Sequence, residues 1–64
     1  MNRPFSLVVD SGNEDEPEPR TFGSLVTALQ ALNEYEEKWR RFAWIREQCP
    51  DGSIVVHVRD GQVT

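Results

Sequence analysis

The stretch AWIREQCPDGSIVVHVRDG, residues 43–61, decides the fold, because it predicts two strands joined by a tight turn. Residues 50–52 read Pro-Asp-Gly; proline presets φ for a turn, and glycine accepts a positive φ. A type I turn with Gly52 in a bulge pairs Cys49 with Ser53. The segment therefore predicts a β-hairpin.

The register of this hairpin determines which side chain faces the core. The bulged turn places Trp44 beside Val58, on the core side of the sheet. A two-residue turn shifts the pairing by one residue and places Ile45 there, because such a slip turns every side chain to the other face. The Pro-Asp-Gly segment favours the first register, whereas the charge of Arg46 favours the second.

The segment before the hairpin has the period of an amphipathic helix. Leu25, Leu29 and Leu32 lie at positions i, i+4 and i+7, which places them on one face. Ser24 is the best N-cap, because its hydroxyl can accept a free backbone N–H of the first turn. We expect one helix over residues 24–41.

A first strand is predicted at residues 5–10, where Phe5, Leu7 and Val9 share one face. Residues 20–22 can add a short second strand. The expected fold is α+β, a small antiparallel sheet covered on one face by a single helix. Its order is β-α-β-β, or β-β-α-β-β if residues 20–22 pair.

The chain is expected to form a single small domain over residues 1–64, with an acidic loop at 10–19. Asp60-Gly61 is expected to end the last strand and leave residues 62–64 as a tail. The uncovered face of the sheet would carry Val8, Val55, His57 and either Ile45 or Trp44. An apolar face without a covering helix predicts a contact surface.

Composition narrows the classes of partner. Eleven Asp and Glu against seven Lys and Arg give a formal net charge of −4, which disfavours nucleic acid and anionic membranes and favours basic proteins. A 64-residue chain with one cysteine has no internal disulfide, so a homodimer is a natural source of added stability. No apolar run has membrane-spanning length, and a lone thiol fits a cytoplasmic location.

Histidine, cysteine and carboxylate side chains often act in catalysis or bind metals in other proteins, but in this chain they have simpler interpretations. His57 is expected on the open sheet face, with no aligned nucleophile, and Cys49 is interpreted as a turn residue. The carboxylates of residues 14–18 lack the spacing of a calcium loop. We therefore expect no metal, no cofactor and no enzymatic activity.

The segment DSGNEDEPEP, residues 10–19, has five acidic residues among ten and no hydrophobic one. It is either a solvated loop or a negative arm that docks on a basic surface, because long-range attraction raises association rates. Acidic residues of the predicted helix extend this charge. The candidate partner-binding residues are Asp10, Glu14, Asp15, Glu16 and Glu18, then Glu34, Glu36 and Glu37.

A basic and aromatic cluster supports a different class of partner. Single-stranded nucleic acid binds to such clusters by stacking and charge. The alternative is that Trp39 belongs to the core and the basic side chains pair with helix acids. The cluster comprises Lys38, Arg40, Arg41 and Arg46 with Trp39, Phe42 and Trp44.

Three segments, FSLVVDSG (5–12), FGSLVTALQALNEYEEKW (22–39) and AWIREQCPDGSIVVHVRDG (43–61), give the chain its pattern. This pattern resembles small acidic proteins of bacteriophages and mobile elements, some of them anti-CRISPR inhibitors. The resemblance implies a non-enzymatic inhibitor that blocks a host defence complex sterically or by nucleic-acid mimicry. The alternatives are a structural or regulatory homodimer and a small nucleic-acid-binding protein.

Overall fold

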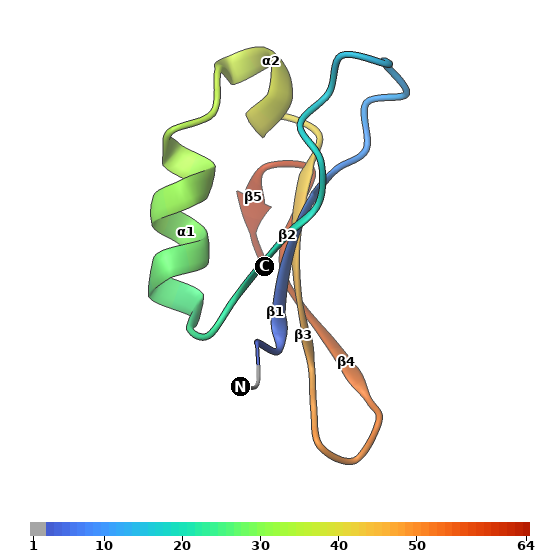
Figure 1. The fold of residues 1–64 in the computed structure, drawn as a ribbon, viewed down its shortest axis with the longest axis vertical. Helices are drawn as coiled ribbons and strands as arrows, with labels where there is room; N and C mark the ends of the chain where they lie inside the picture. Colours follow the sequence, from blue (N-terminus) through green and yellow to red (C-terminus); the bar gives the residue numbers. More distant parts are fainter. Residues whose placement is uncertain (1–2) are drawn as a thin grey trace.

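The computed structural model describes residues 3–64. Its five strands form one antiparallel sheet in the order β2-β1-β3-β4-β5 (Figure 1). The predicted α+β fold is confirmed, and residues 20–22 do pair with the first strand. The elements in chain order are β1 (Phe5–Val9), β2 (Arg20–Phe22), α1 (Leu25–Asn33), α2 (Glu37–Arg40), β3 (Ala43–Gln48), β4 (Ile54–Arg59) and β5 (Gln62–Val63).

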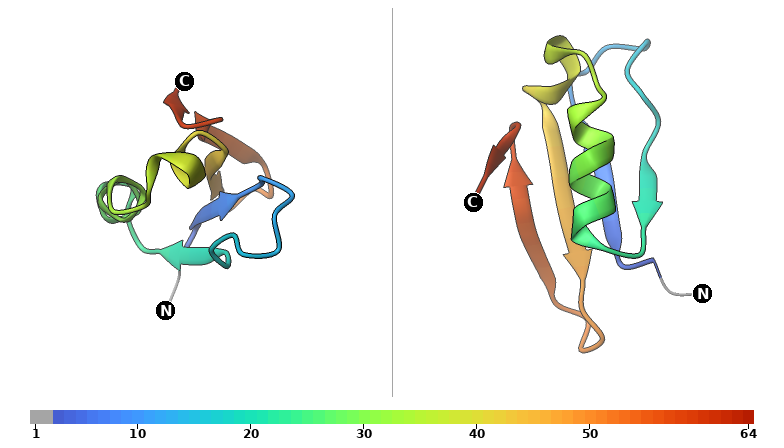
Figure 2. Two further views of the ribbon diagram at one scale, coloured as in Figure 1. Left: turned by 90° about the horizontal axis from the view of Figure 1, so that it is seen from above. Right: turned by 90° about the vertical axis from the view of Figure 1, so that its left-hand side faces the viewer.

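One face of the sheet carries the core, and α1 covers it (Figures 1 and 2). Leu7, Ile45 and Val58 are its largest fully buried side chains. They lie on three neighbouring strands, where Leu7 pairs with Ile45 and Ile45 pairs with Val58. The remaining buried hydrophobic residues are Val9, Ala28, Ala31, Leu32 and Ala43.

The predicted single helix over residues 24–41 is wrong, because the chain turns between α1 and α2. Ser24 caps α1 as expected, with its Oγ accepting the Thr27 amide at 3.3 Å. A straight helix of residues 24–41 would span about 27 Å, whereas the five residues of β1 span about 17 Å. The extended backbone of Glu36 (φ −62°, ψ 153°) redirects the chain, and Trp39 packs against the core.

The hairpin has the predicted turn but a different register at its far end. The Cys49 amide donates to the Ser53 carbonyl at 2.8 Å, and Gly52 has a φ of 91°. The pairing then shifts between Ile45 and Arg46, where a β-bulge adds one residue to β4. The favoured placement of Trp44 on the core side is therefore wrong.

The bulge also corrects the expected position of His57. Its Nε2 lies 2.9 Å from Oε1 of Glu47, and its ring centroid lies 5.7 Å from that of Phe5. Phe5 packs against the core, so His57 lies on the helix-covered side rather than on the open face. A bulge places two successive residues, here His57 and Val58, opposite one residue of the partner strand.

Residues 62–64 are not a free tail. Asp60 and Gly61 both have positive φ (49° and 81°), as a type I′ turn requires. This turn returns the chain along β4, where Val63 pairs with Val58. The hairpin adds β5 to one edge of the sheet.

Candidate functional site

The acidic loop, residues 10–19, connects β1 to β2 and has a defined internal structure. Both the amide and the hydroxyl of Ser11 donate to Oε2 of Glu16, at 2.8 and 2.7 Å. Oδ1 of Asn13 accepts the amide of Asp15 at 2.9 Å, and its carbonyl accepts the amide of Glu16 at 3.1 Å. These short-range bonds fix the loop, as Asn and Ser often do in turns.

Glu16 differs from the other predicted partner-binding carboxylates, because its charge serves the loop. The side-chain and backbone hydrogen bonds from Ser11 lower the pKa of Glu16 below 4.5. The carboxylates of Asp10, Glu14, Asp15 and Glu18 are exposed, and they accept no hydrogen bond within residues 3–64. These four are available to a partner, whereas Glu16 positions the loop that carries them.

Acidification is expected to loosen the loop. Because the pKa of Glu16 is lowered in the folded protein, its stabilising effect is complete above about pH 4.5 and is lost as the pH falls through the lowered value. The chemical shift of the Ser11 amide, followed by NMR from pH 7 to pH 2, should report this transition. Glu16→Gln keeps an oxygen acceptor without a charge and should abolish it. A wild-type Ser11 resonance that does not change below pH 4.5 would contradict this role.

The second group of predicted acids lies at the same end of the molecule as the loop (Figures 1 and 2). Glu34 follows α1 as its C-cap residue, and Glu37 begins α2. The carboxylate of Glu36 lies 3.4 Å from the ammonium group of Lys38, and both side chains are exposed. An exposed pair of this kind contributes little to stability, but it offsets part of the negative charge.

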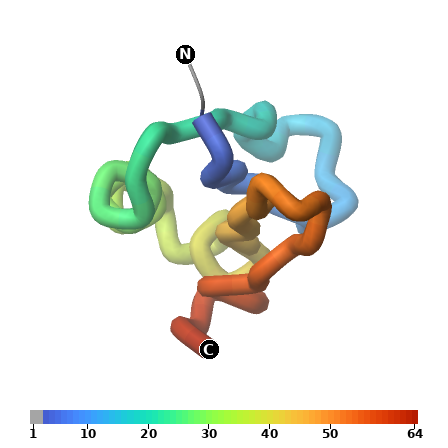
Figure 3. The backbone as a smooth tube through the Cα atoms, turned by 90° about the horizontal axis from the view of Figure 1, so that it is seen from below, coloured from blue at the N-terminus to red at the C-terminus, as the bar shows by residue number. Residues whose placement is uncertain are grey.

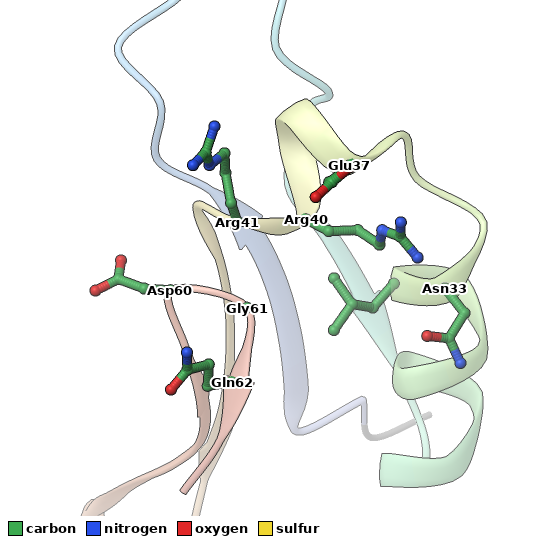
Figure 4. A pocket seen from close by; sticks show the side chains of 8 residues that line it. Asn33, Glu37, Arg40, Arg41, Asp60, Gly61 and Gln62 are labelled. Carbon is green, nitrogen blue, oxygen red and sulfur yellow. The ribbon is translucent and has the colours of Figure 1, made fainter.

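A shallow, open depression of about 330 Å³ lies between the end of α1, α2 and the β4–β5 turn. Figure 4 shows Glu37 and Arg40 on its α2 side and Asp60 and Gln62 on its turn side. Acidic and basic groups both line it, so it presents no single charge to a ligand. Among residues 3–64, no group of three His, Cys, Asp or Glu side chains is arranged to hold a metal ion.

The predicted basic and aromatic cluster is divided by the fold. Trp39 packs against the core, and Arg40 and Arg41 line the depression. Trp44 and Arg46 instead lie on the open face of the sheet, opposite the buried Ala43 and Ile45 of the same strand.

The structure adds Arg59 to this group, which the predicted register did not. The guanidinium carbons of Arg46 and Arg59 lie 4.9 and 5.0 Å from the ring centroid of Trp44. A sequence signal for this contact existed. The apolar alternation of β3 and that of β4 are out of step by one residue, and a bulge is the usual way to reconcile them.

No family model, curated protein or solved structure matches this chain. In the described part of the chain, no helix is both long and apolar enough to cross a membrane.

Proposed function

We propose that the protein is a non-catalytic binding module whose acidic loop docks on a basic surface of a protein partner. The observation that carries this proposal is that hydrogen bonds hold the loop in a defined conformation. Ser11, Asn13 and Glu16 hold it by hydrogen bonds. The other four carboxylates, of Asp10, Glu14, Asp15 and Glu18, are exposed and accept no hydrogen bond within residues 3–64. A preordered loop loses less conformational entropy when it binds than a flexible one.

Charge supports the same class of partner. The net charge of −4 and the four exposed loop carboxylates attract basic surfaces over long range and speed association. Glu34, Glu36 and Glu37 are second in importance, since Lys38 pairs with Glu36 and Arg40 lines the same depression as Glu37. The open depression supports a non-catalytic role, because it does not shield reacting groups from water.

The resemblance to small phage and mobile-element proteins supports a narrower form of the proposal. In that form the partner is a nucleic-acid-binding complex of a host, and the carboxylates occupy positions that phosphates would take. Such a protein would act as an anti-defence inhibitor.

Neutralising the loop should weaken partner binding and its dependence on salt. The triple variant Glu14→Gln, Asp15→Asn and Glu18→Gln removes three exposed charges and leaves the Ser11–Glu16 bonds in place. At about 0.5 kcal/mol for each exposed ion pair, we expect roughly a tenfold loss of affinity. The measurement is capture of proteins from a native-host lysate on the immobilised protein, followed by titration of the captured partner at low and high salt.

The matched control is Asp51→Asn, in the β3–β4 turn at the opposite end of the molecule (Figure 1). Asparagine can still accept the bonds that Asp51 receives from Ser53. The control should bind as the wild type does. A triple variant that retains the same partner, with the same affinity at every salt concentration, would rule out the loop as the docking element.

A further inference from the structure

The open face of the sheet carries an aromatic centre flanked by arginines. We call it the Trp44 face and define it by Val8, Trp44, Arg46, Val56 and Arg59. Val8 pairs with Trp44 on β1, and Val56 pairs with Arg46 on β4. Phe42 precedes β3, is 39% exposed and lies within 5.9 Å of the Arg41 guanidinium. Helix α1 covers only the other face.

The two arginines of this face are held in place but have no acidic partner among residues 3–64. Both guanidinium groups stack on the half-buried ring of Trp44 at about 5 Å, which limits their rotamers. The ion pairs within residues 3–64 are Lys38–Glu36 and His57–Glu47, so neither Arg46 nor Arg59 is neutralised there. Trp and Arg are also the residues most enriched at the energetic centres of protein interfaces.

The acidic loop lies on the same side of the sheet as the Trp44 face. In Figures 1, 2 and 3 the loop projects away from α1, beyond the end of β1. The Asp10 amide donates to the Phe42 carbonyl at 3.1 Å, which ties the start of the loop to the edge of the face. One side of the molecule thus presents the loop carboxylates beyond the end of β1 and, beside them on β3 and β4, two arginines that have no ion-pair partner among residues 3–64.

Such a face is complementary to itself. A twofold axis that lies between two facing copies, parallel to β3 and over Trp44, carries the acidic loop from the β1–β2 side of one copy to the β4 side of the other, where Arg59 lies, and the reverse contact forms at the same time. The apolar side chains of Val8, Trp44 and Val56 then meet at the centre, where water is excluded. We infer that the protein forms a symmetric homodimer through its Trp44 faces, with each acidic loop on Arg46 and Arg59 of the second copy.

Charge distinguishes this occupant from single-stranded nucleic acid. Two arginines attract phosphate, but the adjoining carboxylates of Glu14, Asp15 and Glu18 repel it, and the net charge is −4. A second copy satisfies both charged groups. The inference is independent of the proposed function, although a basic partner and a second copy would compete for the loop.

A charge-swap experiment on the purified protein tests the inference. Sedimentation velocity should show a wild-type dimer whose dissociation constant rises with salt. The variant Arg46→Glu with Arg59→Glu should dissociate at least about tenfold more easily, and so should Glu14→Lys with Asp15→Lys and Glu18→Lys. An equimolar mixture of the two variants should restore the dimer, because each loop then meets a face of opposite charge.

The control variant, Arg20→Glu with Lys38→Glu, makes the same change in net charge outside the Trp44 face and should dimerise as the wild type does. Circular dichroism confirms that each variant is folded. Two results would overturn the inference: a wild-type monomer at every soluble concentration, or folded swap variants that remain monomeric when mixed. A wild-type monomer that binds labelled oligothymidine, with affinity lost in the Arg46 and Arg59 variant, would assign the face to nucleic acid instead.

Discussion

Ile45→Ala should destabilise the protein by about 2–5 kcal/mol, the cost of removing a fully buried aliphatic side chain and leaving a cavity. The free energy of unfolding of a 64-residue domain is about 3–10 kcal/mol, so this single change can unfold a large fraction of the molecules. Ile45 contacts the core from the central strand β3, between Leu7 on β1 and Val58 on β4. Urea denaturation measures the loss.

The neighbouring residue provides the control. Trp44 lies on the open face, so Trp44→Ala should cost only about 1 kcal/mol, measured where the wild type is monomeric. Without the bulge the two effects would exchange, because Trp44 would be buried and its truncation would cost about 3–5 kcal/mol. If Ile45→Ala does not fold, Ile45→Val should still cost about 0.5–1.5 kcal/mol. A larger loss for Trp44→Ala than for Ile45→Ala would contradict the bulged register.

This hairpin shows what the sequence could and could not predict. Pro50, Asp51 and Gly52 specify their turn by local backbone preferences, so the Cys49–Ser53 pairing was predictable. The bulge depends on packing across three strands, and neither glycine nor proline marks it at His57. The sequence did show a conflict, because the register that places Trp44 beside Val58 also turns the charged Arg46 toward the core. Local rules alone do not decide how a sheet resolves such a conflict.

The candidate site divides in the same way. Composition predicted an acidic loop, and its position after β1 followed from the strand pattern. The role of Glu16 was not predicted, because five acidic residues look alike until Ser11 is seen to bind one of them. Arg59 was missed because its contact with Trp44 follows from the bulge.

The break between α1 and α2 has a tertiary cause as well. Leu25, Leu29 and Leu32 identified the helix correctly, and Ser24 identified its start. The apolar period continues through Tyr35 and Trp39, so the sequence resembles one long helix. The length of the sheet ends α1, because residues beyond it would have no core to cover.

Gly61→Ala should be the most disruptive change on the surface of the molecule. Gly61 has a φ of 81°, and an added Cβ would lie 2.3 Å from the backbone oxygen of Arg40. Backbone strain of about 1–3 kcal/mol and a forced displacement of similar cost give an expected loss of about 2–6 kcal/mol. The amide of Gly61 also donates to the Ala43 carbonyl at 3.0 Å, so the turn cannot move away freely.

Substitutions at two other glycines distinguish the cost of backbone strain from the cost of the clash with Arg40. Gly52 has a φ of 91° but open space around it, so Gly52→Ala should cost about 1–2 kcal/mol from strain alone. Gly23 has neither a positive φ nor a close neighbour, and Gly23→Ala should change stability by no more than about 0.5 kcal/mol. In thermal unfolding, the Tm of Gly61→Ala should therefore be well below that of Gly52→Ala, and the Tm of Gly23→Ala should be close to that of the wild type. Equal losses at Gly61 and Gly52 would mean that the β4–β5 turn does not pack against α2 in solution.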